Sequence, residues 1–486
     1  MSGRLGIALA VGFASACATQ SLMVKAEREV RAEMARGNHE RALKVLRDAN
    51  GKGFRARDSV AYYMNEGMLL HLTGRYKESN AVFARAQRMS DDLYTKSVSK
   101  RVAATFTSDA TLDYRGDDHE RVLINVVKAL NYLRMGENGG ALVEARKIDE
   151  RLKTLSVDRF QKGVYRRDAF ASWLMGLLFE MEESWDDARI AYVKALDVYE
   201  EDFKRLFGMP VPPYVAEDVA RAAVLSGDEV TAERMRARAM PARGVPGATA
   251  LGADVESMGE LLGRNGEVIV IHFNGRAPER GDLYIDCAFR STAAWSCALE
   301  PGGESMVRAA HDLAAFGGTR LRVVFPTQTM YEPQNRDVTL YVGATKAKAH
   351  VAHPVARVAN KVLGDRMHLI FRDTIVRAVT KTIAAKAAAA AGRAVGDAIG
   401  GKKKGWLASL FGAIFGGAAS VAMAAVEESD KRSWFTLPAR IEVARAIVPP
   451  GEHDVELRLP WGAAKRLGRV NVRAGERVVL THHTTP

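Results

Sequence analysis

Cys17 has the clearest chemistry in this sequence, because it stands directly behind a short export signal. Arg4 is followed by an apolar run over residues 5–13 and then by the small residues Ala14-Ser15-Ala16. One positive charge, a short apolar run and a small-residue cleavage site are typical of a bacterial secretory signal. The apolar run is too short to span a bilayer, which takes roughly 20 residues. We therefore predict a signal peptide of the lipoprotein type over residues 1–17, with a thioether-linked diacylglycerol on the thiol of Cys17.

Simple secretion is the alternative interpretation of the same residues. Ala14-Ser15-Ala16 also satisfies the A-x-A rule of the ordinary signal peptidase, and Ala14 stands where lipoprotein signals usually carry Leu. Lipidation is favoured because ordinary cleavage would leave an unexplained cysteine at the new N-terminus. Ala18, rather than Asp, follows Cys17, which indicates transport onward to the outer membrane.

The two remaining cysteines lie in a segment that folds symmetrically about Thr292. Folding there opposes three pairs on one face: Cys287–Cys297, Phe289–Trp295 and Ile285–Leu299. Matched pairs of this kind predict an antiparallel hairpin with a short loop. Directly opposed residues lie within disulfide range and the periplasm is oxidising, so we predict a Cys287–Cys297 disulfide. The alternative is that both are buried small apolar residues.

The formal net charge of +12 favours anionic partners such as phospholipid headgroups, acidic glycans or acidic proteins. Residues 1–17 carry one charged residue, Arg4, so removal of the signal lowers the net charge by one to +11. An exported protein does not meet the genome, and nucleic acid is therefore excluded as a partner.

The sequence predicts no enzyme, no cofactor and no metal site. It contains neither a Walker-type glycine loop nor a Gly-x-Ser-x-Gly motif. His350 and His353 have a spacing that can share a metal, but no third ligand lies near them in the sequence. We therefore name no catalytic residue.

An uncharged apolar segment over residues 406–426 is the most ambiguous part of the chain. A membrane-entering helix or helical hairpin would place the flanking lysines on anionic headgroups. The alternative is a small-residue helix packed inside the second half against the helix expected over residues 355–395, and we favour this burial. The residues that define the membrane candidate are Lys402, Lys403, Lys404, Trp406, Gly412 and Gly416.

The first half of the chain reads as paired helices with a tetratricopeptide-like pattern. In such a unit, small residues stand where two helices cross closely and large residues fill the gaps between them. Turn signals recur at residues 37–39, 74–76, 136–138, 184–185 and 227–229. The signature residues of the two strongest copies are Tyr63, Gly67, Ser79, Phe83 and Ala86, and then Gly176, Trp185, Ala188, Tyr192 and Ala195.

Repeat stacks expose a concave surface that binds peptides or protein segments and rarely catalyses. Charged residues that could line this groove include Glu27, Arg28, Arg31, Arg134, Glu144, Arg146, Arg166 and Arg167. The alternative for each of them is a place on a solvated face.

Beyond residue 266 the period becomes strand-like, and strands are expected around residues 267–273, 321–325, 338–342, 439–445, 455–459 and 470–480. The fold class is α+β: a helical repeat solenoid followed by a β-sandwich-like domain with a long helical insertion. The expected divisions are signal peptide 1–17, repeats 18–241, linker 242–265, first β-rich part 266–345, helical insertion 346–426 and second β-rich part 427–486.

Four segments of this chain resemble a proteobacterial family of repeat-containing lipoproteins. They are residues 266–278, the Ala-Leu-Asn-Tyr of residues 129–132, the Val-Glu-Ala-Arg of residues 143–146, and the Ser-Trp-Phe-Thr-Leu-Pro within residues 430–438. The resemblance implies an outer-membrane lipoprotein and a link to lipoprotein activators of peptidoglycan synthases. It implies no catalytic residues.

Taken together, these patterns predict a lipid-anchored docking scaffold at the periplasmic face of the outer membrane, with periplasmic or outer-membrane protein partners. The alternative is an oligomeric, membrane-inserting pore or secretion-channel component that uses residues 406–426. Assembly with further copies of the same chain is left open by both.

Overall fold

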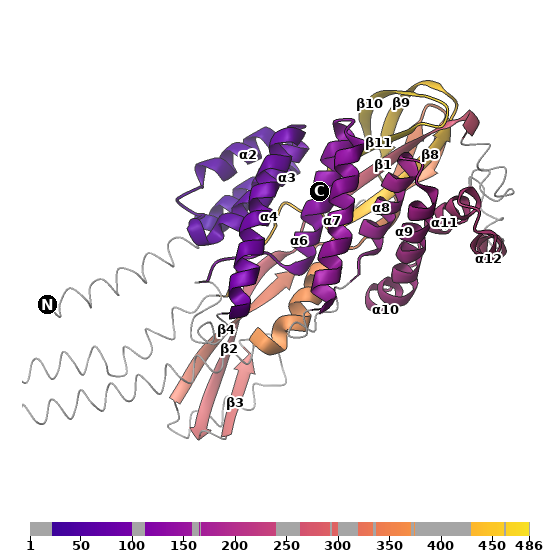
Figure 1. The fold of residues 1–486 in the computed structure, drawn as a ribbon. Coiled ribbons are helices and arrows are strands. Elements are labelled where there is room, and N and C mark those ends of the chain that lie inside the picture. The colour runs from indigo at the N-terminus through magenta and orange to yellow at the C-terminus, as the bar shows by residue number, and fades with distance from the viewer. Residues whose placement is uncertain are drawn as a thin grey trace, which may run out of the picture.

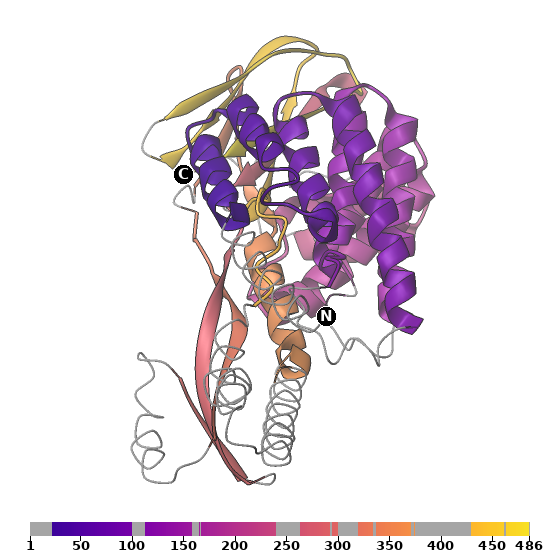
Figure 2. The ribbon, with the colours of Figure 1, turned by 90° about the vertical axis from the view of Figure 1, so that its left-hand side faces the viewer.

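The computed structural model describes residues 22–99, 112–157, 165, 167–239, 263–291, 294–299, 319–333, 337–370, 374, 429–460 and 463–485. Helical hairpins stand side by side along one flank of the molecule, and the strands lie along the other (Figure 1). In a view rotated by 90°, one sheet and the helix over residues 355–370 extend away from the body of the molecule (Figure 2).

The described part of the first half contains five helical hairpins, and each predicted turn falls between the two helices of one of them. The first pairs a helix over residues 22–35 with α2 (His39–Asp48). The others are α3 (Ser59–Leu72) with α4 (Tyr76–Ser99), α6 (Asp118–Arg134) with α7 (Asn138–Val157), α8 (Ala169–Met181) with α9 (Trp185–Val198), and α11 (Pro213–Leu225) with α12 (Glu229–Ala239). Short helical pieces are η1 (Ala56–Asp58), η3 (Tyr199–Phe203) and α10 (Lys204–Phe207). The tetratricopeptide-like interpretation is thus confirmed at the level of fold.

The predicted placement of small against large residues lets two of the hairpins pack closely. A Cβ added to Gly67 would lie 2.7 Å from the Phe83 ring, and one added to Gly176 would lie 2.5 Å from the Tyr192 ring. Both distances are far below a normal carbon contact, so only glycine lets α3 approach α4, and α8 approach α9, this closely.

The described strands form three sheets. The first has the order β11 (Arg477–Thr484), β1 (Gly266–Asn274), β8 (Arg440–Val448) and β7 (His350–His353). The second has the order β10 (Ala464–Val472), β9 (Gly451–Arg458), β5 (Thr339–Val342) and β6 (Thr345–Lys348). The third has the order β3 (Ala294–Leu299), β2 (Glu279–Ser291) and β4 (Thr319–Thr329).

Strand β1 is the centre of the molecule, and all nine of its residues are buried. Successive side chains of a strand point to opposite faces. Ile269, Ile271 and Phe273 join the core shared with the helices, whereas Val268 and Val270 join the core shared with the second sheet. The chain is therefore mixed α+β, as predicted, with the first sheet packed on both faces, and the finer β-sandwich description stays a prediction.

The helical insertion does not begin at residue 346 as predicted, because β6 and β7 occupy residues 345–353. The helix starts at Val355, directly after Pro354, where the fixed φ of proline ends the strand. Residues 375–428, which include the apolar segment, and most of the predicted linker lie outside the described residues.

Candidate functional site

Residues 429–438 run along the inner face of the helical array, meaning the side of the helices that faces the strands. We call these residues the inner segment. Its Trp434 is 1% exposed, and the indole centroid lies 5.4 Å from that of the Phe83 ring on α4. Phe435 and Leu437 are buried as well. The surface that the repeat pattern predicted as an open groove is thus covered, over the first repeats, by a segment of the same chain.

Asn65 on α3 holds the backbone of the inner segment with both ends of its amide. Its Nδ2 donates to the carbonyl of Ser433 over 3.1 Å, and its Oδ1 accepts the backbone N–H of Thr436 over 3.0 Å. Asn65 is fully buried, so both bonds satisfy groups that water cannot reach. Contacts of this kind are indifferent to the side chains that the held segment carries.

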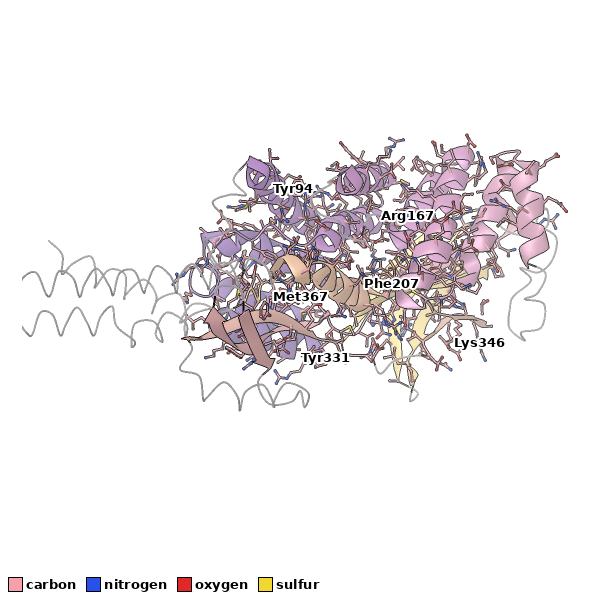
Figure 3. All side chains as sticks on the ribbon, turned by 90° about the horizontal axis from the view of Figure 1, so that it is seen from below. Tyr94, Arg167, Phe207, Tyr331, Lys346 and Met367 are labelled. Atoms are coloured by element: carbon pink, nitrogen blue, oxygen red, sulfur yellow. The ribbon has the colours of Figure 1, made fainter. Side chains whose placement is uncertain are left out.

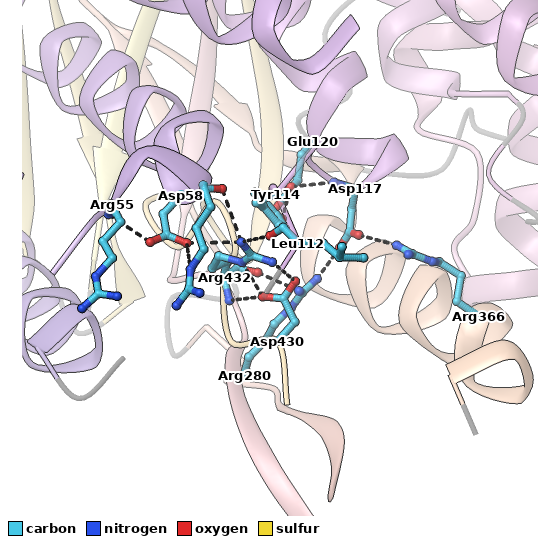
Figure 4. Close-up of polar contacts among 11 residues, drawn as sticks. Arg55, Asp58, Leu112, Tyr114, Asp117, Glu120, Arg280, Arg366, Asp430 and Arg432 are labelled. Carbon is cyan, nitrogen blue, oxygen red and sulfur yellow. Dashed lines mark hydrogen bonds and ion pairs between the residues drawn. The ribbon is translucent and has the colours of Figure 1, made fainter. Parts of the chain in front are cut away.

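Arg432 anchors the segment through its guanidinium, which lies at the centre of the network in Figure 4. Its Nε and Nη2 donate to the two carboxylate oxygens of Asp430, over 2.8 and 2.9 Å. Its Nη1 donates to the carbonyl of Leu112 over 2.7 Å and lies 3.2 Å from Asp58. Burial disfavours the charge, but the carboxylates of Asp430 and Asp58 raise the pKa of Arg432 above its ordinary value. The cation is therefore permanent.

A second arginine, Arg280 on β2, enters the same network from the strand side. It donates to the carboxylate of Asp117 and to the carbonyl of Arg432. The Asp117 carboxylate also accepts a hydrogen bond from Arg366. Burial favours the neutral form of Asp117, but Arg280 and Arg366 outweigh it and lower the pKa of Asp117. The carboxylate therefore stays ionised between two cations.

Glu120 joins α6 to the inner segment from the other side of this network. Its Oε1 accepts the backbone N–H of Trp434 over 2.7 Å, and its Oε2 accepts the hydroxyl of Tyr114 over 2.6 Å. Burial, followed by the nearby carboxylate of Asp117, raises the pKa of Glu120. The described contacts use Glu120 to position backbone, with no solvent-exposed atom at which it could exchange protons with a substrate.

Buried ion pairs also join the helices of the later repeats to the strands. Arg445 on β8 donates from Nη1 to both carboxylate oxygens of Asp218, each over 2.6 Å. Arg477 on β11 donates to Glu180 over 2.6 Å. Further along, the Nε2 of His353 on β7 lies 2.9 Å from the carboxylate of Asp168, directly before α8. The helices and the strands are thus joined by buried charged groups from both sides, including Arg221 on α11 and Glu267 on β1.

This arrangement can bind and orient polypeptide. Its charged groups are buried and bonded to one another. In the ranges that the structure describes, no three His, Cys, Asp or Glu residues are placed to hold a metal ion. His353 of the His350–His353 pair uses its Nε2 on Asp168.

The predicted groove residues differ in their exposure to solvent. Arg134 and Arg146 are exposed, the first stacked over Tyr76 and the second over Phe179. Glu144 is buried and bonded to Lys128 over 2.9 Å and to Asn125 over 2.7 Å, so it offers no carboxylate to a partner. Arg166 lies outside the described residues.

Most of the remaining predicted site residues belong to the two segments around Cys17 and around residues 402–416. Cys17, Lys402, Lys403, Lys404, Trp406, Gly412 and Gly416 lie outside the described residues. Within the part of the chain that is described, no helix has the length and apolarity needed to cross a membrane. The predicted hairpin register is confirmed, because Ile285, Cys287 and Phe289 of β2 pair with Leu299, Cys297 and Trp295 of β3. The disulfide itself stays a prediction.

Sequence reasoning missed the polar residues of the inner face. Asn65, Glu180 and Asp218 each stand in a helix whose remaining buried residues are mostly apolar. A lone polar residue in an apolar helix was the available signal, since a buried polar group requires a partner. The partners lie far away in the sequence, so the signal does not name them.

The sequence matches no protein-family model and no curated protein. Among solved structures, the chain is similar to residues 41 to the end of MamA from Desulfovibrio magneticus RS-1, at 15% identity and a TM-score of 0.30. That match covers 45% of this chain and 94% of the other. Apo RapI is similar at 12% identity and a TM-score of 0.33, over 45% of this chain and 53% of RapI. BtubC from P. vanneervenii is similar at 15% identity and a TM-score of 0.32, over 47% of this chain and 89% of that one.

Proposed function

We propose that this protein is a docking scaffold of the bacterial envelope, tethered to the outer membrane through Cys17 and facing the periplasm. In this proposal the repeats and strands act as one rigid body that presents a protein-binding surface. The observation that carries it is the inner segment: the array already holds a stretch of polypeptide, with a turn at residues 434–437, through an amide clamp and a buried tryptophan.

Because the inner face is covered by the chain itself, the partner is expected on the outer surface of the array. The second helices of the last three hairpins each expose a large apolar residue there. Val143 on α7 is 48% exposed, Ile190 on α9 is 53% exposed and Val230 on α12 is 82% exposed. Exposed apolar side chains on successive helices favour protein contact. Arg146, one turn from Val143, adds a cation of the kind enriched at interfaces.

Crosslinking in cells distinguishes the two faces. A photoreactive residue at position 143, 190 or 230 should trap the same partner, whereas one at position 65 should react within the chain, on the inner segment. Trapping of a partner from position 65, with none from the three outer positions, would contradict an outer docking surface.

The tether is tested separately by the Cys17→Ala variant. Lipidation predicts that the wild-type chain incorporates labelled fatty acid and sediments with the outer membrane, and that the variant does neither. If the wild-type chain is secreted without label, ordinary signal cleavage replaces the lipid anchor.

A further inference from the structure

A pocket of about 460 Å³ lies where the last repeat meets the strands, and Ala439, directly after the inner segment, is part of its lining. One wall is the loop over residues 208–213 between α10 and α11. The other walls are residues 330–333 at the end of β4 and the start of the helix over residues 355–370. Arg357 ties them together, because it donates to the carbonyl of Phe207 over 3.0 Å. Phe207 and Tyr331 are labelled on this side in the view from below (Figure 3).

The pocket walls are rigid, which keeps the space open. Five prolines line the pocket: Pro210, Pro212, Pro213, Pro333 and Pro354. Each has a fixed φ, and Pro212, Pro333 and Pro354 are buried in the surrounding structure. A preformed site loses little conformational freedom when a ligand enters, so ordering of the walls offsets little of the binding free energy.

The lining is apolar in its body and cationic at two points. Met209, Val211, Val351 and Ala356 contribute apolar surface, and Met330 is 43% exposed beside them. The volume falls in the range of small-ligand sites, which is roughly 300–1,000 Å³. The few polar groups in this lining suit a largely hydrocarbon ligand better than a sugar or a nucleotide.

The charges indicate the sign of the headgroup. Arg357, Arg440 and one acidic residue, Glu332, line the pocket, and Arg440 is already paired with the buried Glu442 over 2.7 Å. The headgroup is therefore expected at Arg357. The Arg357 Nη2 lies 3.6 Å from the Glu332 carboxylate, and both side chains are half exposed, so this pair is weak. An incoming anion can therefore take the place of Glu332 at Arg357, whose Nη1 keeps its bond to the carbonyl of Phe207.

We propose that this pocket binds a single-chain amphiphile with an anionic headgroup, with the chain against Val211 and Ala356 and the headgroup at Arg357. The proposal is independent of the outer docking surface. The anion can be a carboxylate, as in a free fatty acid, or a phosphate, as in a lysolipid, and the test includes both.

Calorimetric titration of the full mature chain with laurate, dodecyl phosphate and dodecyltrimethylammonium tests the proposal. Both anions should bind, and the cation should bind at least about fivefold more weakly, as expected for one partly screened charge. Preference for laurate would identify a carboxylate ligand, and preference for dodecyl phosphate a phosphate ligand.

Three variants separate the pocket from general surface binding. Val211→Trp, on the half-exposed loop, should abolish binding of both anions by filling the pocket. Arg357→Gln should weaken them about fivefold and leave dodecanol unchanged, whereas Arg466→Gln on the exposed face of β10 should change nothing. Equal binding of the cation, or unchanged laurate binding by a folded Val211→Trp variant, would overturn the proposal. If Val211→Trp does not fold, Ala356→Met with the same titration decides in its place.

Discussion

On the inner face of the array, polar side chains meet residues that are far away in the sequence, whereas within each hairpin the contacts are made by neighbours in the sequence. Asn65 bonds to Ser433 and Glu120 bonds to the backbone of Trp434. By contrast, Gly67 on α3 lies against the ring of Phe83 on α4, the next helix in the sequence. The local contacts define the hairpin, and the distant contacts decide what the array holds. The difference teaches that a repeat pattern specifies the shape of a groove without saying whether the groove is open.

The largest expected effect comes from Arg432, where the inner face differs most from the surface. Arg432→Met removes a buried cation from Asp430, Asp58 and two carbonyl groups. Removing one partner of a buried ion pair costs about 3–5 kcal/mol, and several acceptors place this variant at the upper end. The loss should appear as a lower midpoint in urea unfolding. Arg432→Lys keeps the charge but cannot reach all the acceptors. Its urea midpoint should therefore lie between those of the wild type and of Arg432→Met.

The matched control is Arg458→Met, because Arg458 makes an equally short contact of 2.6 Å with Glu456 on the exposed side of β9. An exposed pair contributes only about 0–1 kcal/mol. If the two variants lose similar stability, the inner face is not special and the comparison fails.

Trp434 tests whether the inner segment is anchored by packing as well as by charge. Trp434→Ala removes a buried indole from Phe83 and should cost about 3–4 kcal/mol through lost contacts and the cavity that remains. Trp434→Phe keeps an aromatic ring in the site and should cost clearly less. Equal losses for the two variants would mean that the size of the ring does not matter there. Both are measured by the same urea unfolding.

A group of histidines gathers around β1 and β11, which should make the stability of the fold depend on pH. His272 of β1 and His482 of β11 stack with centroids 6.0 Å apart, and His39 and His483 lie 6.1 Å apart beside them. Burial, followed by the neighbouring His272, Lys465 and His39, lowers the pKa of His482 to about 4. Glu442 faces His272 from β8 over 2.9 Å, and Thr485 contacts His483.

The sign of the pH effect follows from the lowered pKa. The folded state excludes a proton that the unfolded chain accepts near pH 6.5, so the contribution of His482 is complete above 6.5 and is lost as the pH falls toward 4. His482→Phe should flatten the fall in unfolding free energy over this window by up to about 1.4 kcal/mol per pH unit. His368→Gln, on the exposed face of the helix over residues 355–370, should leave the slope unchanged. An unchanged slope for His482→Phe would remove this histidine from the acid response.

The sequence predicted the hairpins and most strands because those signals are local. The turn residues at 37, 74, 136 and 227 are glycines with positive φ, and the β2–β3 register follows from matched side chains on one face. Strands β6 and β7 were missed although they are no shorter than β5, because their sequences, TKAK and HVAH, lack the run of β-branched and aromatic residues that marks β5.

The inner face could not be predicted from the sequence, because no local rule pairs Arg432 with Asp58 or Trp434 with Phe83. The charge of Glu144 suggested an exposed residue, yet Lys128 on the preceding helix holds it inside over 2.9 Å. A carboxylate on a helix looks the same in the sequence whether it meets water or a buried cation.

The smallest expected effect belongs to the turn between α8 and α9, and it tests the local half of the comparison. Four hairpins turn through a glycine with φ between 75° and 77°, but this one turns through Glu183, whose φ is 57°. A side chain in this conformation costs about 1–2 kcal/mol, whereas a glycine costs about 0.4–1 kcal/mol in added freedom of the unfolded chain. Glu183→Gly should therefore stabilise the fold by roughly 0.5–1 kcal/mol in urea unfolding. Glu182→Gly, at an exposed neighbour with a φ of −98°, should not stabilise it, because there glycine relieves no strain. If both variants behave alike, the turn is not governed by its own backbone geometry, and the local contacts of the hairpin depend on the rest of the molecule as much as the inner face does.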